Sequence, residues 1–190
     1  MTSTLTSTDR YQAAYEQRQA ASDKFAALRT QAYERFESVG FPIARKGNER
    51  WKYTNIAPIA RTEFRIPDSA TALVSLDDIK QHLPVDDSWR TLAFVDGVYS
   101  NELSTIGNDK TDVVIERFAT ANVSLAEELG SVAHIEEDDG FGSLNTALFA
   151  DGAIVRFSGE IDSESPVHLL FVTTEHEHPT LTSPRVLVVA

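Results

Sequence analysis

The sequence of 190 residues contains no cysteine. A chain without cysteine forms no disulfide bond, offers no thiolate to a metal ion and has no thiol nucleophile. Long hydrophobic runs are also missing, since no stretch approaches the roughly 18 apolar residues of a membrane span. The first residues, MTSTLTSTDR, lack the basic and apolar regions of a secretory signal. We therefore expect a soluble protein of the cytoplasm that does not bind membranes.

The common motifs of catalysis are missing as well. The chain has no Gly-x-Gly-x-x-Gly or Walker loop for phosphates, no Gly-x-Ser-x-Gly nucleophile turn and no His-Glu-x-x-His zinc motif. Carboxylates are abundant, but no pair of them stands out as acid and base. The residues by themselves indicate an α+β protein without a visible active site.

The formal charge of −12 is distributed unevenly along the chain. Residues 1–60 carry nine Lys and Arg against six Asp and Glu, whereas residues 61–190 carry eight against twenty-three. The acidic part repels phosphate backbones, so nucleic-acid binding is not expected. Such an asymmetry is more typical of two structural units than of one binding face.

The first part of the chain predicts helix over residues 9–38, with 9–21 as a separate arm. Gly40 is expected to end this helix. The apolar residues that recur at spacings of three and four are Phe25, Leu28, Ala32 and Phe36.

Shorter elements are expected in the middle. Thr54 or Asn55 caps a short helix, and Ser75 begins another in capping-box fashion that ends near residues 83–84. Asp96-Gly97 between two apolar runs predicts a β-hairpin. The other expected elements are a strand over 112–118, a helix from Ser124 to a stop at Gly130, a loop over 136–143 and a short helix over 144–150.

The last part predicts three strands, within residues 153–157, 166–174 and 184–190. Val186–Ala190 is continuously apolar, which suits a strand buried on both faces. Chains seldom end inside such a strand, because its ladder partners must come from elsewhere. Two interpretations stay open: the sequence is the front portion of a longer protein, or it is a complete small domain whose last strand is a covered edge.

The run from His176 to His178 is the one metal-like cluster in the sequence. On a strand both imidazoles would share a face and could bind a divalent ion. No third His lies at ligand spacing and Pro179 follows, so a solvated turn is the preferred interpretation. Glu136–Asp139 do not match a calcium loop, and His168 is interpreted as a hydrogen-bonded strand residue. The sequence therefore assigns no catalytic, cofactor or metal ligand.

A carbohydrate-active or carbohydrate-binding β-helix or sandwich is the alternative function. Its acid and base would come from Asp151, Glu160, Asp162 or Glu164. However, the aromatic residues of the β region read as core by alternation: Phe149, Phe157 and Phe171.

The stretch GNERWKYTNIAPIA, residues 47–60, places two large aromatics among charges. Trp51 and Tyr53 alternate with Lys52 and Thr54, so the aromatics are expected on one side of the chain and the polar residues on the other. The pattern favours packing of the helical segment against its neighbours over a platform for a ligand.

Five motifs in chain order resemble those of the SufD family. Residues 40–60 resemble its Gly-x-Pro segment followed by Glu-x-Trp-Lys-Tyr-Thr, here Gly40, Pro42, Glu49 and Trp51 to Thr54. The other four are LAFVDGVYSNELS (92–104), FGSLNTALFADGAIVRF (141–157), SPVHLLFV (165–172) and SPRVLVV (183–189).

The resemblance implies a non-catalytic scaffold subunit of the Suf iron–sulfur cluster assembly system, binding no cofactor within this part. Its implied partners are a SufB-like sister subunit and a SufC-like ATPase, and a homodimer is left open. The family's cluster-assembly residues would lie beyond Ala190, so none is assigned to this chain.

The expected fold class is α+β: an N-terminal helical region, a small mixed α/β part and the first strands of the right-handed parallel β-helix that the resemblance implies. The expected parts are a helical arm and connector over 1–60, a mixed region over 61–139 and a truncated start of the β-helix over 140–190.

Overall fold

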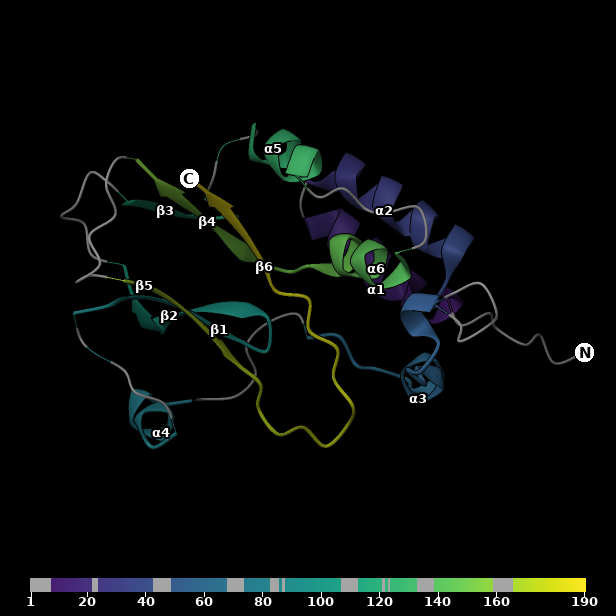
Figure 1. Cartoon of the computed structure of the whole chain (residues 1–190), viewed down its shortest axis with the longest axis horizontal. Coiled ribbons are helices and arrows are strands. Elements are labelled where there is room, and N and C mark those ends of the chain that lie inside the picture. Colours follow the sequence, from purple (N-terminus) through teal and green to yellow (C-terminus); the bar gives the residue numbers. More distant parts are fainter. Residues whose placement is uncertain are drawn as a thin grey trace, which may run out of the picture. The chain divides into compact units, whose positions relative to one another are not determined.

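The computed structural model describes residues 8–21, 24–42, 49–67, 74–82, 86, 88–106, 113–120, 122, 124–132, 139–158 and 166–190. Contacts divide the chain into two units. Residues 1–66 with 123–149 form what we call the helical unit, and residues 67–122 with 150–190 form the strand unit. Figure 1 shows the elements of both.

The helical unit is an assembly of short helices. Its described elements are η1 (Asp9–Tyr11), α1 (Gln12–Ala21), α2 (Ala26–Val39), η2 (Glu49–Trp51), α3 (Ala57–Arg61), α5 (Ser124–Val132) and α6 (Gly140–Leu148). α2 packs against α6, and α1 contacts both (Figure 1). The predicted helix with a separate arm is therefore confirmed as α1 and α2. Gly40 ends α2 with φ 64°, and its N–H donates to the carbonyl oxygen of Phe36 at 2.7 Å.

Aromatic side chains form much of the core of the helical unit. The ring of Phe36, which has no exposed surface, meets Tyr11 edge-on at 5.6 Å and Phe41 at 5.2 Å. Phe41 in turn lies 5.3 Å from Phe141 of α6. Such pairs add about 0.5–1.5 kcal/mol each beyond the burial of their area. The buried members of the predicted apolar stripe are Phe25, Ala32 and Phe36.

The start of α6 differs from the sequence prediction. Asp139 caps this helix, because its Oδ1 accepts the N–H of Gly142 at 2.8 Å. Gly140 lies so close to the carbonyl oxygen of Gly40 that any side chain there would clash with it. The predicted loop over 136–143 is thus wrong from Gly140 onward, and its earlier residues up to 138 lie outside the described part of the chain.

α5 also runs past its predicted end. The helix continues through Gly130 to Val132, so the predicted stop at Gly130 is wrong. A glycine ends a helix only where it leaves helical geometry, and here it stays helical beside the Leu28 side chain of α2.

The strand unit contains two three-stranded sheets and one short helix. Its elements are α4 (Leu76–Lys80), β1 (Arg90–Val95), β2 (Val98–Thr105), β3 (Val113–Arg117), β4 (Gly152–Phe157), β5 (Val167–Val172) and β6 (Arg185–Val189). The strand orders are β2-β1-β5 and β3-β4-β6 (Figure 1). The predicted hairpin at Asp96-Gly97 and the three C-terminal strands are confirmed.

Each sheet is mixed. β1 pairs antiparallel with β2 and parallel with β5, and β4 pairs antiparallel with β3 and parallel with β6. The α+β class is therefore confirmed, but a right-handed parallel β-helix is not shown by these two small sheets.

β1 is buried along its whole length because both of its faces are covered. Leu92 and Phe94 pack into a core shared with Ala153 and Val155 of β4, so the two sheets face each other. On the opposite face, α4 supplies Ile79 to a second cluster. The other buried members of that cluster are Ala93, Val95, Leu103 and Leu170.

β2, the outer strand of the first sheet, is irregular. The pairing shifts between Thr91 and Ala93, which oppose Thr105 and Ser100 respectively. The hydroxyl of Ser104 accepts the N–H of Ala93 at 2.9 Å and donates to the carbonyl oxygen of Ser100 at 2.5 Å. A side chain thus takes the place of a ladder bond, which makes this edge a poor template for another strand.

One of the two predicted caps, that of α4, occurs in the structure, whereas the N-cap of α3 is Ile56, without a side-chain cap, and not Thr54 or Asn55. The hydroxyl of Ser75 accepts the N–H of Asp78 at 3.2 Å and the Asp78 carboxylate accepts the N–H of Ser75 at 2.9 Å, which is the predicted capping box. Asn55 Oδ1 accepts the N–H of Ala57 at 3.1 Å at the start of α3. α4 ends at Lys80, and its predicted end near residues 83–84 falls outside the described residues.

Candidate functional site

The edges formed by β5 and β6 are the first candidate surface. Both strands are outermost in their sheets, and each pairs in parallel with a central strand. Phe171 stacks on the buried Phe94 at 5.4 Å, yet 49% of its surface is exposed. Val188, in register with the buried Val155, is 55% exposed. We call these two strand edges with Phe171 and Val188 the open edge.

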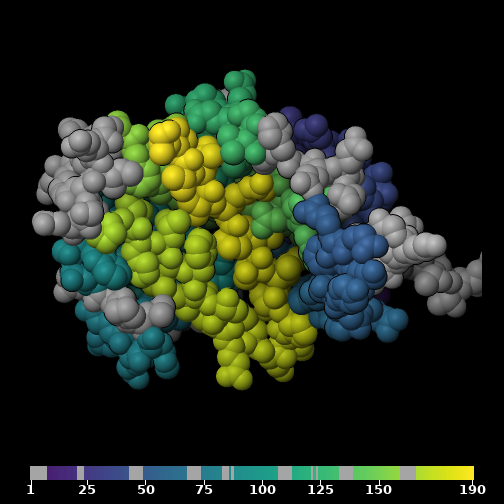
Figure 2. Space-filling model, viewed as in Figure 1, coloured from purple at the N-terminus to yellow at the C-terminus, as the bar shows by residue number. Residues whose placement is uncertain are grey.

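Two sequence predictions are wrong at the open edge. Phe171 was expected in the core, but on the outermost strand only one side of its ring is covered. The last strand was expected to be buried on both faces, but only Leu187 of β6 is buried. In Figure 2 the yellow atoms of the C-terminal residues lie on the visible surface. Unpaired backbone groups and apolar side chains together make a surface that another strand could extend.

The Trp-Lys-Tyr-Thr segment separates its two aromatics. The Trp51 ring packs on Phe141 of α6 at 5.4 Å and is half-buried, so its predicted packing role is confirmed. Tyr53, in contrast, is 90% exposed, so the prediction that both aromatics pack on one side is wrong for Tyr53. The chain turns between them, since the N–H of Thr54 donates to the carbonyl oxygen of Trp51 at 3.1 Å. A turn removes the alternation on which the prediction relied.

A buried acid lies in the β1–β2 turn of the strand unit. Asp96, with φ 50°, accepts a hydrogen bond from the N–H of Thr174 at 3.0 Å and another from the Thr174 hydroxyl at 2.7 Å. His176 Nε2 lies 3.2 Å from Asp96 Oδ2 and 3.1 Å from the Thr174 hydroxyl. This cluster ties the segment after β5 to the hairpin turn.

The environment of Asp96 favours its ionised form. Burial alone would raise the pKa of this carboxyl, but the hydrogen bonds from the Thr174 N–H and hydroxyl, together with His176, lower it below its ordinary value. Thr174 and His176 approach the same carboxylate, and the hydroxyl contacts Nε2 of His176 while donating its proton to Asp96. The hydroxyl is therefore not activated as in a nucleophile–base–acid triad, where the nucleophile and the acid contact different ring nitrogens of the histidine base.

The histidines of the predicted metal-like cluster separate in the structure. His176 faces Asp96, whereas His178 is exposed. Across the described ranges of the chain, no group of three or more His, Asp or Glu side chains could hold a metal ion. His168 contacts the Thr91 hydroxyl at 3.5 Å and the Trp89 ring edge-on at 5.4 Å, as expected for a hydrogen-bonded strand residue.

The residues proposed for sugar chemistry form no acid–base pair in the described structure. Asp151 is buried and accepts a hydrogen bond from Arg117 at 3.0 Å, and its other oxygen accepts the N–H of Gly152. Glu160, Asp162 and Glu164 lie outside the described residues. No observation supports the carbohydrate alternative.

Sequence reasoning missed one buried cation. Arg29 of α2, a charged residue among the apolar positions of the predicted helix, is only 2% exposed. Its guanidinium lies 4.6 Å from the Phe149 ring and 5.5 Å from Phe25, and donates to the carbonyl oxygens of Phe149 at 3.1 Å and Arg18 at 3.3 Å. Burial, and secondly the charge of Arg18, lower the pKa of Arg29 to about 10. This arrangement holds α2 to the end of α6 and has a structural role.

None of the helices within the described ranges combines the length and apolar character needed to cross a membrane.

Comparison with known proteins identifies the family to which this chain is similar. Residues 1–169 match the family model described as the SufBD protein N-terminal region. Over 177 residues the chain is 28% identical to a protein of Synechocystis sp. described as an iron-sulfur cluster assembly SufBD family protein. The aligned part covers 90% of this chain and 35% of that protein, so the chain spans about a third of the length of this relative.

Proposed function

The chain belongs to the SufBD family, and from this premise we propose that it is the N-terminal part of a SufD-like, non-catalytic scaffold subunit in iron–sulfur cluster assembly. The observation on which the proposal rests is the family match over residues 1–169. The relative's description as an iron-sulfur cluster assembly protein supports the same process. In this role a SufB-like sister subunit and a SufC-like ATPase are the partners, and the cytoplasm is the location.

The path of the last three strands supports a role as the start of a larger coil. β4, β5 and β6 alternate between the two sheets, and β6 returns to pair with β4 in parallel and in register. A chain that continued this path would place its next strand on β5. We propose that these strands are the first turn of a parallel β-helix, and that further turns cover Phe171 and Val188.

Hydrogen exchange tests the coil directly. In the full-length protein the backbone N–H groups at the outer edges of β5 and β6 are expected to pair with following strands, so their exchange slows relative to the 190-residue chain. The outer edge of β2, where the pairing is irregular at Ser104, serves as the internal control. Its backbone N–H groups are expected to exchange at the same rate in the full-length protein and in the 190-residue chain. Equal exchange at β5 and β6 in the two proteins would contradict the coil.

Co-expression tests the scaffold role. Tagged full-length protein, expressed with the SufB-like subunit and the SufC-like ATPase, is expected to co-purify with both. Deleting its gene is expected to lower the activity of iron–sulfur enzymes in the cell. If neither partner co-purifies and cluster maturation is normal after the deletion, the scaffold role is wrong.

The non-catalytic part of the proposal needs its own test. Asp96 and His176 form an acid–imidazole contact in the strand unit, so they are suitable residues to substitute. Asp96→Asn and His176→Gln proteins that still assemble with the partners are expected to support cluster maturation at the wild-type rate. Loss of maturation in an assembled variant would indicate chemistry in this chain.

A further inference from the structure

Tyr53 is displayed on the surface of the helical unit although most aromatic side chains of the chain are covered. Its exposed fraction is 90%, and the next most exposed aromatic, Phe171, has 49%. Ile59 of α3, also in the segment after Trp51, is 41% exposed. Exposed Tyr and Ile on one short segment are the kind of side chains that serve as anchors in protein interfaces.

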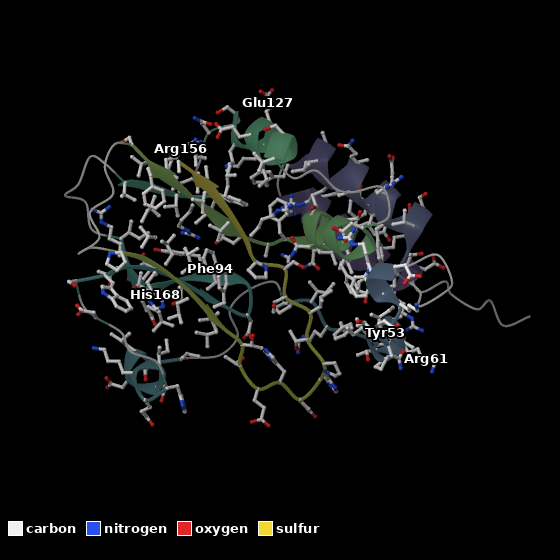
Figure 3. The ribbon with its side chains drawn as sticks, in the orientation of Figure 1. Tyr53, Arg61, Phe94, Glu127, Arg156 and His168 are labelled. Atoms are coloured by element: carbon white, nitrogen blue, oxygen red, sulfur yellow. The ribbon has the colours of Figure 1, made fainter. Side chains whose placement is uncertain are left out.

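The exposed side chains come from one small region, which we call the Tyr53 patch: Lys52, Tyr53, Ile59 and Arg61. The helix α3 within it has five residues and is therefore only about 7 Å long. Figure 3 labels Tyr53 and Arg61, which lie near each other in this view.

The backbone beneath the Tyr53 patch is held on both sides. Before it, Trp51 packs on Phe141 at 5.4 Å. After it, the guanidinium of Arg10 donates to the carbonyl oxygen of Arg61 at 2.9 Å and to that of Ala60 at 3.5 Å. Ile56, between the two, is only 8% exposed. A side chain on a fixed backbone loses less conformational entropy on binding, which favours its use as an anchor.

The segment that carries the patch is positively charged in an acidic chain. Residues 49–66 contain four Lys and Arg against two Asp and Glu, whereas the whole chain has a formal charge of −12. Lys52 pairs with Glu49 at 3.3 Å. The guanidinium of Arg61 makes no ion pair or hydrogen bond with any residue in the described part of the chain, so its charge is available to a partner.

We propose that the Tyr53 patch is a docking surface for an acidic segment of another protein, which would receive Tyr53 and Ile59 in an apolar depression and face Arg61 with carboxylates. Complementary charge fixes the choice of partner. A nucleic acid fits less well, because a phosphate backbone is bound through several Lys and Arg side chains, whereas the patch has two, of which Lys52 is already paired with Glu49. A second copy docked through the same face would oppose Arg61 to its own equivalent. The surface goes beyond the scaffold role proposed above and does not depend on it.

Site-specific photo-cross-linking in the native host tests the proposal. The full-length protein is made with p-benzoylphenylalanine in place of Tyr53, and the cross-linked peptides are identified by mass spectrometry. The expected product is an Asp- and Glu-rich peptide of a different protein. The matched control carries the same residue in place of Val132 of α5, which is 63% exposed in the same unit, and is expected not to give this product.

A charge reversal distinguishes docking from chance proximity. Arg61→Glu is expected to lower the cross-link yield about tenfold, as the loss of an interface anchor does. Lys80→Glu, the same kind of change on the exposed surface of α4, is expected to leave the yield unchanged. Thermal unfolding of both variants at the wild-type temperature would show that neither change acts through folding.

Three outcomes would overturn the proposal. The first is a cross-link yield at position 53 no greater than that of the Val132 control, and the second is cross-linking to nucleic acid or to a second copy. The third is a cross-link yield that Arg61→Glu does not change. Co-purification of the SufB-like and SufC-like subunits is a separate measurement, so failure here leaves the scaffold role standing.

Discussion

The helical unit and the strand unit expose apolar side chains in different settings: Tyr53, Ile59 and Val132 lie on a turn or on short helices, whereas Phe171 and Val188 lie on outermost strands. In the helical unit Phe36 and Phe149 have no exposed surface. In the strand unit Phe171 and Val188 belong to the inner face between the sheets, yet about half of each is exposed, 49% and 55% respectively. Helices satisfy their own backbone groups, whereas a sheet edge keeps unpaired donors and acceptors. The strand unit is therefore the part of the chain that can grow by adding strands.

Both units nevertheless bury charged side chains, and Arg29 and Asp96 are accommodated in different ways. Arg29 of the helical unit is surrounded by two aromatic rings and two carbonyl oxygens. Asp96 of the strand unit is hydrogen-bonded by Thr174 and faces His176. Burial opposes the charge in both cases, but only at Asp96 do hydrogen bonds to the ionised form overcome it.

The largest expected effect tests whether the core of the helical unit is covered more completely than the open edge. Phe36→Ala removes a fully buried ring and is expected to lower the free energy of unfolding by about 3–5 kcal/mol. Phe171→Ala removes a ring that is half exposed and is expected to cost less than about 1 kcal/mol in the 190-residue chain. Urea unfolding of the two variants checks the pair. Equal losses would show that the open edge is as closed as the helical core.

A second expected effect concerns the buried cation. Arg29→Ala leaves the carbonyl oxygens of Phe149 and Arg18 without this donor and removes the contacts with two rings, so a loss of about 2–4 kcal/mol is expected. The control is Arg156→Ala, because Arg156 is partly exposed and lies 3.9 Å from Glu116 in an ion pair. Such pairs are worth about 0–1 kcal/mol. Urea unfolding that gave Arg29→Ala no larger a loss than the control would contradict the anchoring role of Arg29.

The two aromatics of the Trp-Lys-Tyr-Thr segment are expected to differ on a smaller scale. Trp51→Ala removes a half-buried ring from Phe141, so about 1–3 kcal/mol is expected, below the cost of a fully buried aromatic. Tyr53→Ala is expected to change stability by less than about 0.5 kcal/mol, as surface substitutions do. Thermal unfolding measures both, and Trp51 fluorescence in a Trp89→Phe background reports the burial of the ring. A stability loss at Tyr53 as large as that at Trp51 would show that Tyr53 packs after all.

The smallest expected effect depends on pH. Because the pKa of Asp96 is lower in the folded chain than in the unfolded chain, its contribution to stability is present above pH of about 4 and is lost as the pH falls through the folded pKa. Asp96→Asn is expected to cost about 1–2 kcal/mol at pH 7 and to remove this part of the acid dependence. Asp77→Asn on the exposed face of α4 is the control. Identical acid-unfolding curves for wild type and Asp96→Asn would contradict the stabilising contribution of the ionised Asp96 carboxylate.

Local signals in the sequence predicted much of the fold. The Ser75–Asp78 capping box, the Asp96-Gly97 hairpin and the end of α2 at Gly40 depend on residues a few positions apart, so a single sequence contains the necessary information. The start of α6 was misplaced because two glycines of the loop, Gly140 and Gly142, belong to the helix. Only the close approach of Gly40 to Gly140 explains the first of them.

The candidate surfaces were less predictable. Alternation predicted one shared side for Trp51 and Tyr53, but a turn at Thr54 separates them. Hydrophobic pattern placed Phe171 in the core, and it does point inward, yet its exposure depends on whether another strand lies beyond it. The carboxylate of Asp96 reaches Thr174 and His176, which are about 80 positions away in the chain. No sequence spacing reports such a contact.

The sequence by itself determined the α+β class, the main helices and strands and, through its ordered motifs, the SufBD family. These depend on local backbone preferences and on residue patterns, which are properties of the chain before it folds. Only the tertiary structure decided that Arg29 is buried, that Tyr53 is exposed, and that the last strands form sheet edges with Phe171 and Val188 half uncovered. Exposure and long-range pairing depend on what lies opposite each side chain in space, and that is fixed only when distant segments pack together.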